Sequence, residues 1–223
     1  ESGIRKAYLE LHISVLLFGL TAVLGELIQL SGPVLVWFRL FITCISYFFL
    51  VRYQKSAIQL TWKELFTFAS AGLILIFHWV TFFGGIKLSN VSIILVCLAT
   101  QSFFTSILEP LLLKKSFRKQ DIGISVLSIA GVYLIARAEW NYIHGIIVGL
   151  ISALLSVLYS IWNKKIVAKY HETIVNAYEL GSGLVVYTFI LPIWFLFFPE
   201  NKILPDWKDA LYLLFLSLVC TTF

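Results

Sequence analysis

The sequence predicts an all-α membrane protein, a polytopic bundle of helices. Three observations indicate this fold class. Hydrophobic residues make up 60% of the 223-residue chain and charged residues only 13%, whereas soluble domains carry about 25% charged residues. The mean hydropathy is +0.91. The apolar residues also gather into long runs, and a helix needs ~20 such residues to cross the hydrocarbon core.

Eight apolar segments follow one another along the chain. The first ends at the Ser31-Gly32-Pro33 turn, and the eighth begins near Ala210 and is still apolar at Phe223. We expect helices, because backbone groups in lipid must bond within their own segment and no alternating ten-residue strands are present. The predicted spans are residues 9–30, 34–51, 65–86, 91–113, 122–136, 145–167, 174–198 and 210–223.

Basic residues in the connections between the spans predict the orientation. Twelve of the 17 Lys and Arg residues flank one set of helix ends, four flank the other set, and Arg39 lies inside the second span. Cytoplasmic loops carry the excess of positive charge, so we expect a cytoplasmic N-terminus and a cytoplasmic loop at residues 114–119. The same scattering argues against nucleic-acid binding, which needs basic residues gathered on one face.

An internal repeat relates two parts of the chain. In each copy a helix dotted with small and polar residues leads through a short turn into a second helix, and Phe38-Arg39-Leu40 corresponds to Tyr178-Glu179-Leu180. The copies start five spans apart. An odd number of spans makes the second copy enter the membrane from the opposite side, so we expect inverted repeats. The predicted units are residues 1–138, with five spans, and residues 139–223, with three. Ten spans are expected in all, and this sequence, which also lacks Met, is expected to be an incomplete copy.

Polar side chains inside the spans are the candidate substrate-binding residues, because polar groups are costly to place in hydrocarbon. His78 and Gln101 lie near the middle of the third and fourth spans. The sixth span carries a stripe at helical spacing, made of Ser152, Ser156, Tyr159 and Asn163. We predict that a small-molecule substrate binds at a midplane cavity, as in secondary transporters, to His78, Gln101, Ser156, Tyr159 and Asn163. The alternative is hydrogen bonding and close packing between helices.

Two pairs of charged residues are predicted to act as gates. Glu26 and Arg39 both lie roughly 7–9 Å below the outer surface by helical rise, so an ion pair could keep both charges in the membrane. The repeat supplies a counterpart with exchanged signs, Lys165 (or Lys164) with Glu179, near the inner surface. The alternative is that both pairs are fixed contacts between helices that never open.

Catalytic motifs are absent from the sequence, and no cofactor or metal site is expected. The chain has no G-x-S-x-G, H-E-x-x-H or Walker loop, and its four His residues lie one per segment. We therefore predict that the protein is not an enzyme. Two alternatives stay open: a membrane-embedded enzyme or channel that uses His78 and Glu109 to handle protons, and a seven-span receptor, which would not explain the repeat. Proton coupling of a transporter also stays open.

The stretch from Trp79 to Ala136 resembles EamA-type transporters of the drug/metabolite transporter superfamily. It carries the "WVTFFGGIKLSNVSIILVCLATQ" block, a basic loop and an "AGVYLIA" helix end, and "FRLF" and "WKDALYLLFLSLVCTTF" match as well. The resemblance implies a bacterial inner-membrane permease, often an exporter of amino acids or similar metabolites, built as two five-helix inverted repeats. In that family the fourth helix often ends in Gly-Glu, whereas here Lys114-Lys115 stands in that place and Glu109-Pro110 lies a turn earlier.

Overall fold

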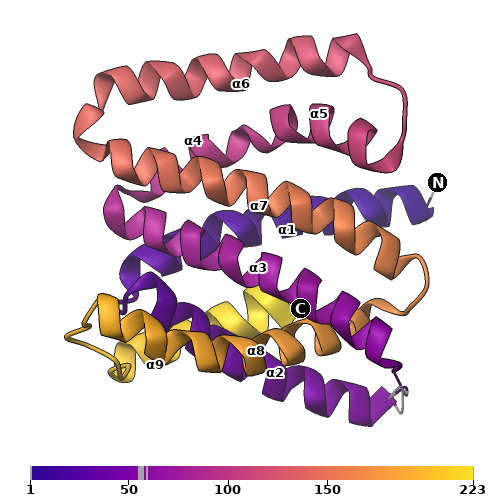
Figure 1. The fold of residues 1–223 in the computed structure, drawn as a ribbon, viewed down its shortest axis with the longest axis vertical. Helices are drawn as coiled ribbons and strands as arrows, with labels where there is room; N and C mark the ends of the chain where they lie inside the picture. The colour runs from indigo at the N-terminus through magenta and orange to yellow at the C-terminus, as the bar shows by residue number, and fades with distance from the viewer. Residues whose placement is uncertain (1, 55–57, 59, 223) are drawn as a thin grey trace.

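The structure is a computed structural model that describes residues 2–54, 58 and 60–222. Helices joined by short connections make up this part of the chain. Successive spans alternate in direction and pack side by side, with α4 and α5 continuing in the same direction (Figure 1). In chain order they are α1 (Ser2–Leu27), α2 (Gly32–Gln54), α3 (Trp62–Leu88), α4 (Val91–Ala99), α5 (Gln101–Leu113), α6 (Lys119–Ala138), the 3-10 turn η1 (Trp140–Tyr142), α7 (Ile143–Val167), α8 (Glu172–Phe197), α9 (Trp207–Ser217) and the π turn η2 (Leu218–Thr222).

Six helical stretches in the described chain are long and apolar enough to cross a membrane. They coincide with the predicted spans one to four, six and seven, and cover Ile4–Leu27, Gly32–Gln54, Trp62–Leu88, Val91–Leu113, Trp140–Val167 and Glu172–Phe197. The predicted fifth span forms α6, in which Ser125–Ala138 is a shorter apolar stretch of the described residues, and the predicted eighth forms α9 and η2. The all-α polytopic fold is thus confirmed. The inverted repeats, their boundaries and the total of ten spans stay predictions.

Side-chain caps fix where several helices begin. Thr61 and Glu64 form a capping box at the start of α3, each side chain bonding to the other residue's backbone N–H. Asn90 accepts from the N–H of Ile93 at the start of α4, at 3.0 Å. Asp206 starts α9 in the same way, and the N–H that it accepts holds the pKa of its carboxyl below the usual range.

A break at Thr100 divides the fourth span into α4 and α5, where the sequence predicted one continuous helix. The Thr100 hydroxyl donates to the carbonyl of Cys97 at 2.6 Å, and its backbone N–H donates to the same oxygen at 3.1 Å. This three-residue closure replaces the regular helical bond, and Ser and Thr side chains commonly bend helices in this way. Interrupted helices of this kind form midplane sites in transporters.

Helix α3 lies between α7 and α8 and contacts both of them as well as α2 (Figure 1). Its buried face carries Ile76, Phe83 and Ile86, which belong to the main hydrophobic core. Where α3 crosses α8, Gly72 lies directly against the backbone carbonyl of Glu179. The absence of a side chain at Gly72 therefore sets the distance between the two helices.

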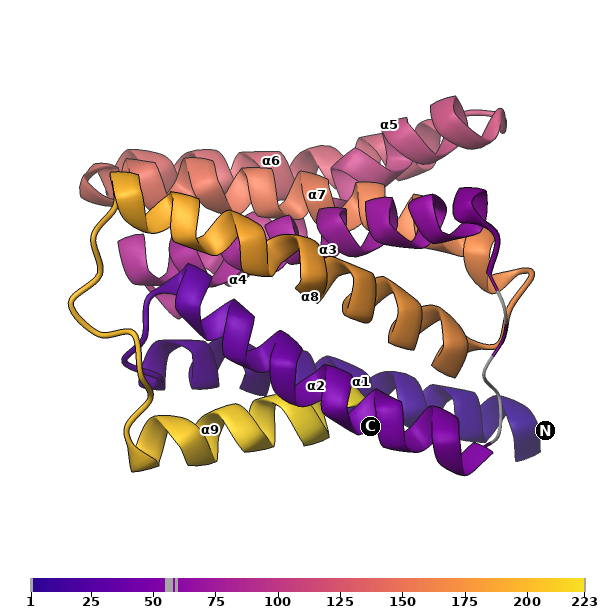
Figure 2. The ribbon, with the colours of Figure 1, turned by 60° about the horizontal axis from the view of Figure 1, so that its bottom comes forward.

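The other helices form two groups, one on each side of the central helix α3. Figure 2 shows α1, α2 and α9 together on one side of α3 and α8, and α5 and α6 on the other side. Within the first group, buried Asp209 joins α9 to the turn between α1 and α2: it accepts from the N–H of Gln29 at 2.8 Å and from Lys202 at 2.7 Å. Helix α6 contacts α5 and α4 and leaves many apolar side chains exposed.

Candidate functional site

A cavity of about 610 Å³ lies among the helices and is the main candidate site. Most helices of the bundle contribute to its wall, which combines apolar side chains with a few polar ones. The lining residues are Val15, Phe18, Gly19, Thr21, Arg39, Tyr47, Leu75, His78, Trp79, Phe82, Leu95, Leu98, Gln101, Ser156, Tyr159, Ser160, Asn176, Leu180, Cys220 and Thr221. We call this space the central cavity.

Four of the five predicted substrate-binding residues line the central cavity. His78 comes from α3, Gln101 from the first turn of α5, and Ser156 and Tyr159 from one face of α7. The sequence placed them together by their depth in the spans and by helical spacing. That they bind a substrate stays a prediction.

Asn163, the fifth predicted residue, does not line the cavity. Its side-chain amide donates to the hydroxyl of Tyr159 at 3.0 Å, so it orients a cavity residue from the next turn of α7. Ser152, at the other end of the same stripe, is fully buried against α3. Both predicted arrangements therefore occur along the stripe. Its middle residues face the cavity, and its end residues form hydrogen bonds with neighbouring residues.

His78 is held by Ser152. The His78 Nδ1 atom lies 2.9 Å from the Ser152 carbonyl oxygen and 2.9 Å from its hydroxyl, and that hydroxyl also bonds to the His78 carbonyl at 3.1 Å. These contacts fix the plane of the imidazole and leave Nε2 as the ring nitrogen available to a ligand.

Arg39 is buried in the cavity wall, with only 4% of its surface exposed. Its guanidinium stacks on the ring of Trp79, with Cζ 3.8 Å from the ring centre, and its Nε and Nη2 donate to the hydroxyl of Thr221 at 3.1 and 2.9 Å. Stacking on Trp is a favourable setting for a guanidinium. The cation is therefore fixed in place by neutral partners.

Glu179 is fully buried behind the cavity wall. Its Oε2 accepts from the Tyr159 hydroxyl at 3.0 Å, and its Oε1 has no hydrogen-bond partner within the described chain. Tyr159 lines the cavity, so one hydroxyl connects the acid to the space where a ligand could lie.

Neither predicted gate pair is formed in this structure. Glu26 is exposed, whereas Arg39 is buried and bonds to Thr221. Helix α1 ends at Leu27, so Glu26 lies in its last turn, while Arg39 lies about two turns inside α2. Lys165 is exposed as well, and Glu179 bonds to Tyr159 instead. The alternative partner, Lys164, pairs with Glu109.

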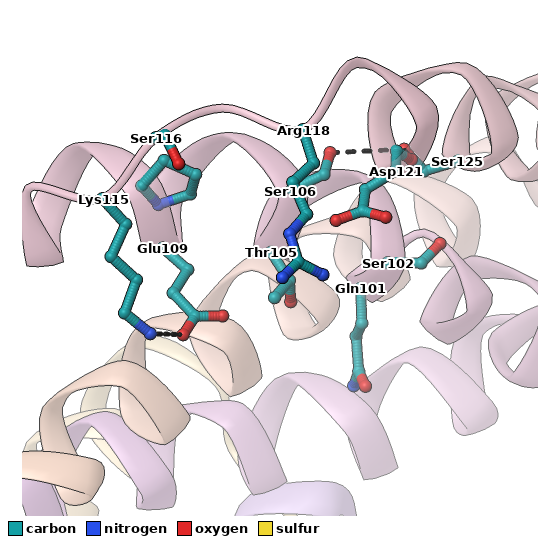
Figure 3. Close-up of a pocket in the computed structure, with 11 residues that line it drawn as sticks. Gln101, Ser102, Thr105, Ser106, Glu109, Lys115, Ser116, Arg118, Asp121 and Ser125 are labelled. Carbon is teal, nitrogen blue, oxygen red and sulfur yellow. Dashed lines mark hydrogen bonds and ion pairs between the residues drawn. The ribbon is translucent and has the colours of Figure 1, made fainter.

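A second, more polar hollow of about 810 Å³ lies between α5 and α6. Figure 3 shows Glu109 directed toward Lys115 at one end of it and the Ser106 and Ser125 hydroxyls facing each other near the other end. Glu109 bonds to both Lys115 and Lys164 at 2.9 Å, which ties α5 to α7. Gln101 lines this hollow and the central cavity alike, so the residue after the break in the fourth span contributes to both walls.

Several cavity residues were not predicted from the sequence. Tyr47 of α2 accepts from the amide of Asn176 of α8 at 3.0 Å, and both line the cavity. Asn176 could have been found by its polarity inside an apolar span. Thr221 could not, because its role depends on where η2 brings it relative to Arg39.

Apolar spans around a cavity with a few fixed polar groups are the arrangement of a multi-pass membrane protein with an internal cavity. Residues 5–137 match the EamA-like transporter family. This match extends over more than half of the chain, which therefore belongs to the EamA-like transporter family and is a membrane transporter of the drug/metabolite transporter type.

A solved structure supports the fold. Described only as "Crystal structure of protein", it aligns over 98% of this chain and 76% of its own length, with a TM-score of 0.69 and 14% sequence identity. At that identity the likeness concerns the fold alone. No curated protein matches the chain.

Proposed function

We propose that the protein is a secondary transporter that carries a small metabolite, such as an amino acid, through the central cavity by alternating access, and that it works as an exporter. One observation carries the proposal: in a member of a transporter family, the polar residues of several spans converge on one cavity. Its volume of about 610 Å³ lies within the range of about 300–1,000 Å³ that small-molecule sites occupy.

The proposed setting is the bacterial inner membrane with a cytoplasmic N-terminus. The N-terminal end of α1, the connection from α5 to α6 and the connection from α7 to α8 lie at the same end of the bundle (Figures 1 and 2). These are regions in which the basic residues gather, and such loops face the cytoplasm.

Cysteine labelling tests this orientation. In a variant without the native Cys residues, Ser116→Cys in intact cells should resist a membrane-impermeant thiol reagent, and Asn141→Cys should react. Both positions are exposed and belong to connections at opposite ends of α6. If Ser116→Cys reacts and Asn141→Cys is protected, the N-terminus faces the opposite side and the proposed orientation is wrong.

Glu179 is the proposed carrier of a coupling proton. A buried carboxylate without a neighbouring cation is costly, and proton relays in membrane transporters use such acids. The Tyr159 hydroxyl gives Glu179 a contact at the cavity wall. This arrangement supports proton-coupled transport.

The alternative of an enzyme or channel that uses His78 together with Glu109 has less support. His78 lines the central cavity, while Glu109 lines the hollow between α5 and α6. Glu109 is also paired with two lysines, so it does not act with His78 on one ligand.

Filling the cavity tests the transport proposal. We expect Ser156→Phe to lower counterflow of labelled amino acids in proteoliposomes at least tenfold, because the new ring would occupy the cavity. The matched control is Ile151→Phe on the same helix, where the side chain is 44% exposed on the outer surface and activity should persist. Equal transport by both variants would show that the substrate does not pass through this cavity.

A further inference from the structure

Arg39 is a buried cation without an acidic partner. No carboxylate of the described residues lies within ion-pair distance of its guanidinium, whereas Glu109, Asp206 and Asp209 all have Lys partners. A buried charge is normally balanced by an opposite charge. The place of Arg39 in the cavity wall suggests that the balancing charge arrives with a ligand.

The donors of Arg39 are only partly used. A guanidinium has five N–H donors, and the contacts to Thr221 involve Nε and Nη2. No residue of the described chain accepts from Nη1. Because Trp79 covers one face of the group at 3.8 Å and Thr221 fixes its edge, the remaining donors are held in a fork that matches a carboxylate.

The rest of the cavity wall indicates what the anionic group is attached to. None of the described residues that line it is Asp or Glu, so the described wall places no carboxylate in contact with a bound anion. Much of the surface is apolar and includes Phe18, Leu75, Phe82 and Leu95. A small inorganic anion would leave most of this apolar space unused, whereas an organic acid would fill it.

We propose that Arg39 binds a carboxylate group of the transported molecule, whose largely apolar body packs against apolar side chains that line the central cavity, such as Phe18, Leu75, Phe82 and Leu95. This inference rests on the proposed transport through that cavity. The shared chemistry is the carboxylate, which a simple organic acid and an apolar amino acid both carry.

Binding to the detergent-purified protein tests the proposal independently of transport. The probes are 3-phenylpropionate, its uncharged amide and phenylalanine, titrated by calorimetry. We expect at least one carboxylate to bind at least tenfold more tightly than the amide, because only the carboxylate offers a negative charge and two acceptor oxygens to the guanidinium fork. Tighter binding of 3-phenylpropionate would indicate an acid as substrate, and tighter binding of phenylalanine would indicate an amino acid.

Substitutions assign the effect to Arg39. Arg39→Gln should abolish the preference for carboxylate over amide, and Arg39→Lys should retain part of it, since it keeps the charge and loses the fork. Arg52→Gln is the matched control, on the exposed end of the same helix, and should bind as the wild type does. The comparison of probes on the wild-type protein stands even if an Arg39 variant does not fold.

Three results would overturn the proposal: no carboxylate binds, the amide binds as tightly as the acid, or Arg39→Gln keeps the wild-type preference. Carboxylate binding without any counterflow in proteoliposomes would contradict the transport function and leave the Arg39 site in place. Counterflow only of substrates that lack a carboxylate would contradict the Arg39 site and leave the transport function in place.

Discussion

Replacing Gly72 with valine is expected to prevent the bundle from reaching a stable, monodisperse folded state. A Cβ atom at this position would lie 2.1 Å from the carbonyl oxygen of Glu179 and 2.9 Å from its carbonyl carbon. Both atoms belong to the backbone of α8, so a side-chain rotation cannot relieve the clash. Extra atoms in a packed interior typically cost ~1–3 kcal/mol, and a clash with backbone should place this variant at or above that range.

The matched control is Gly84→Ala, also in α3, where an added Cβ would have no neighbour within 4 Å. Removing a glycine from a helix interior is itself favourable by about 1 kcal/mol, so this variant should be as stable as the wild type or more stable. Gly72→Ala should already lower the melting temperature. Yield, monodispersity by size exclusion and thermal unfolding in detergent measure the effect, and a Gly72→Val protein as stable as Gly84→Ala would show that α3 and α8 do not cross as described.

The sequence was sufficient to predict the spans because membrane physics leaves few options. A segment in lipid must satisfy its own backbone, so a long apolar run becomes a helix. The cavity residues His78, Gln101, Ser156 and Tyr159 could be grouped for a related reason. Polar side chains inside apolar helices are few, and their spacing shows which ones share a face.

The charged pairs show where this reasoning reaches its limit. Helical rise placed Glu26 and Arg39 at equal depth because the first span was predicted to reach residue 30, whereas α1 ends at Leu27 and Glu26 lies in its last turn. Glu26 is exposed, and the ammonium of Lys87 bonds to the backbone carbonyls of Glu26 and Ile28 at 3.1 and 2.6 Å. The rotation of each helix about its axis depends on the packing of all its neighbours, which no single segment encodes.

The break at Thr100 was missed for a local reason. Thr is common within apolar spans, and whether its hydroxyl bends the helix depends on the carbonyl to which it donates, here that of Cys97. The consequence reaches the site, because Gln101, the residue after the break, lines both the central cavity and the hollow between α5 and α6.

Replacing Glu179 with glutamine is expected to uncouple transport from a proton gradient. The substitution keeps the size of the side chain and an oxygen that can accept from Tyr159, and it removes the group that can bind and release a proton. Uptake driven by a pH difference across proteoliposomes should fall at least tenfold, to the level without a gradient. Counterflow, in which labelled substrate exchanges for unlabelled substrate, does not require net proton movement and should persist.

Two further variants separate coupling from damage to the fold. Tyr159→Phe removes the hydroxyl that connects Glu179 to the cavity at 3.0 Å, so it should weaken the dependence on the gradient while the acid is still present. The control is Glu172→Gln, at the exposed start of α8, the helix that also carries Glu179. This variant should behave as the wild type. Because both oxygens of Glu179 are enclosed and only one has a partner, the neutral glutamine should also fold at least as readily as the native side chain. Gradient-driven uptake that survives in Glu179→Gln at the wild-type rate would show that the coupling proton, if the transporter uses one, binds elsewhere.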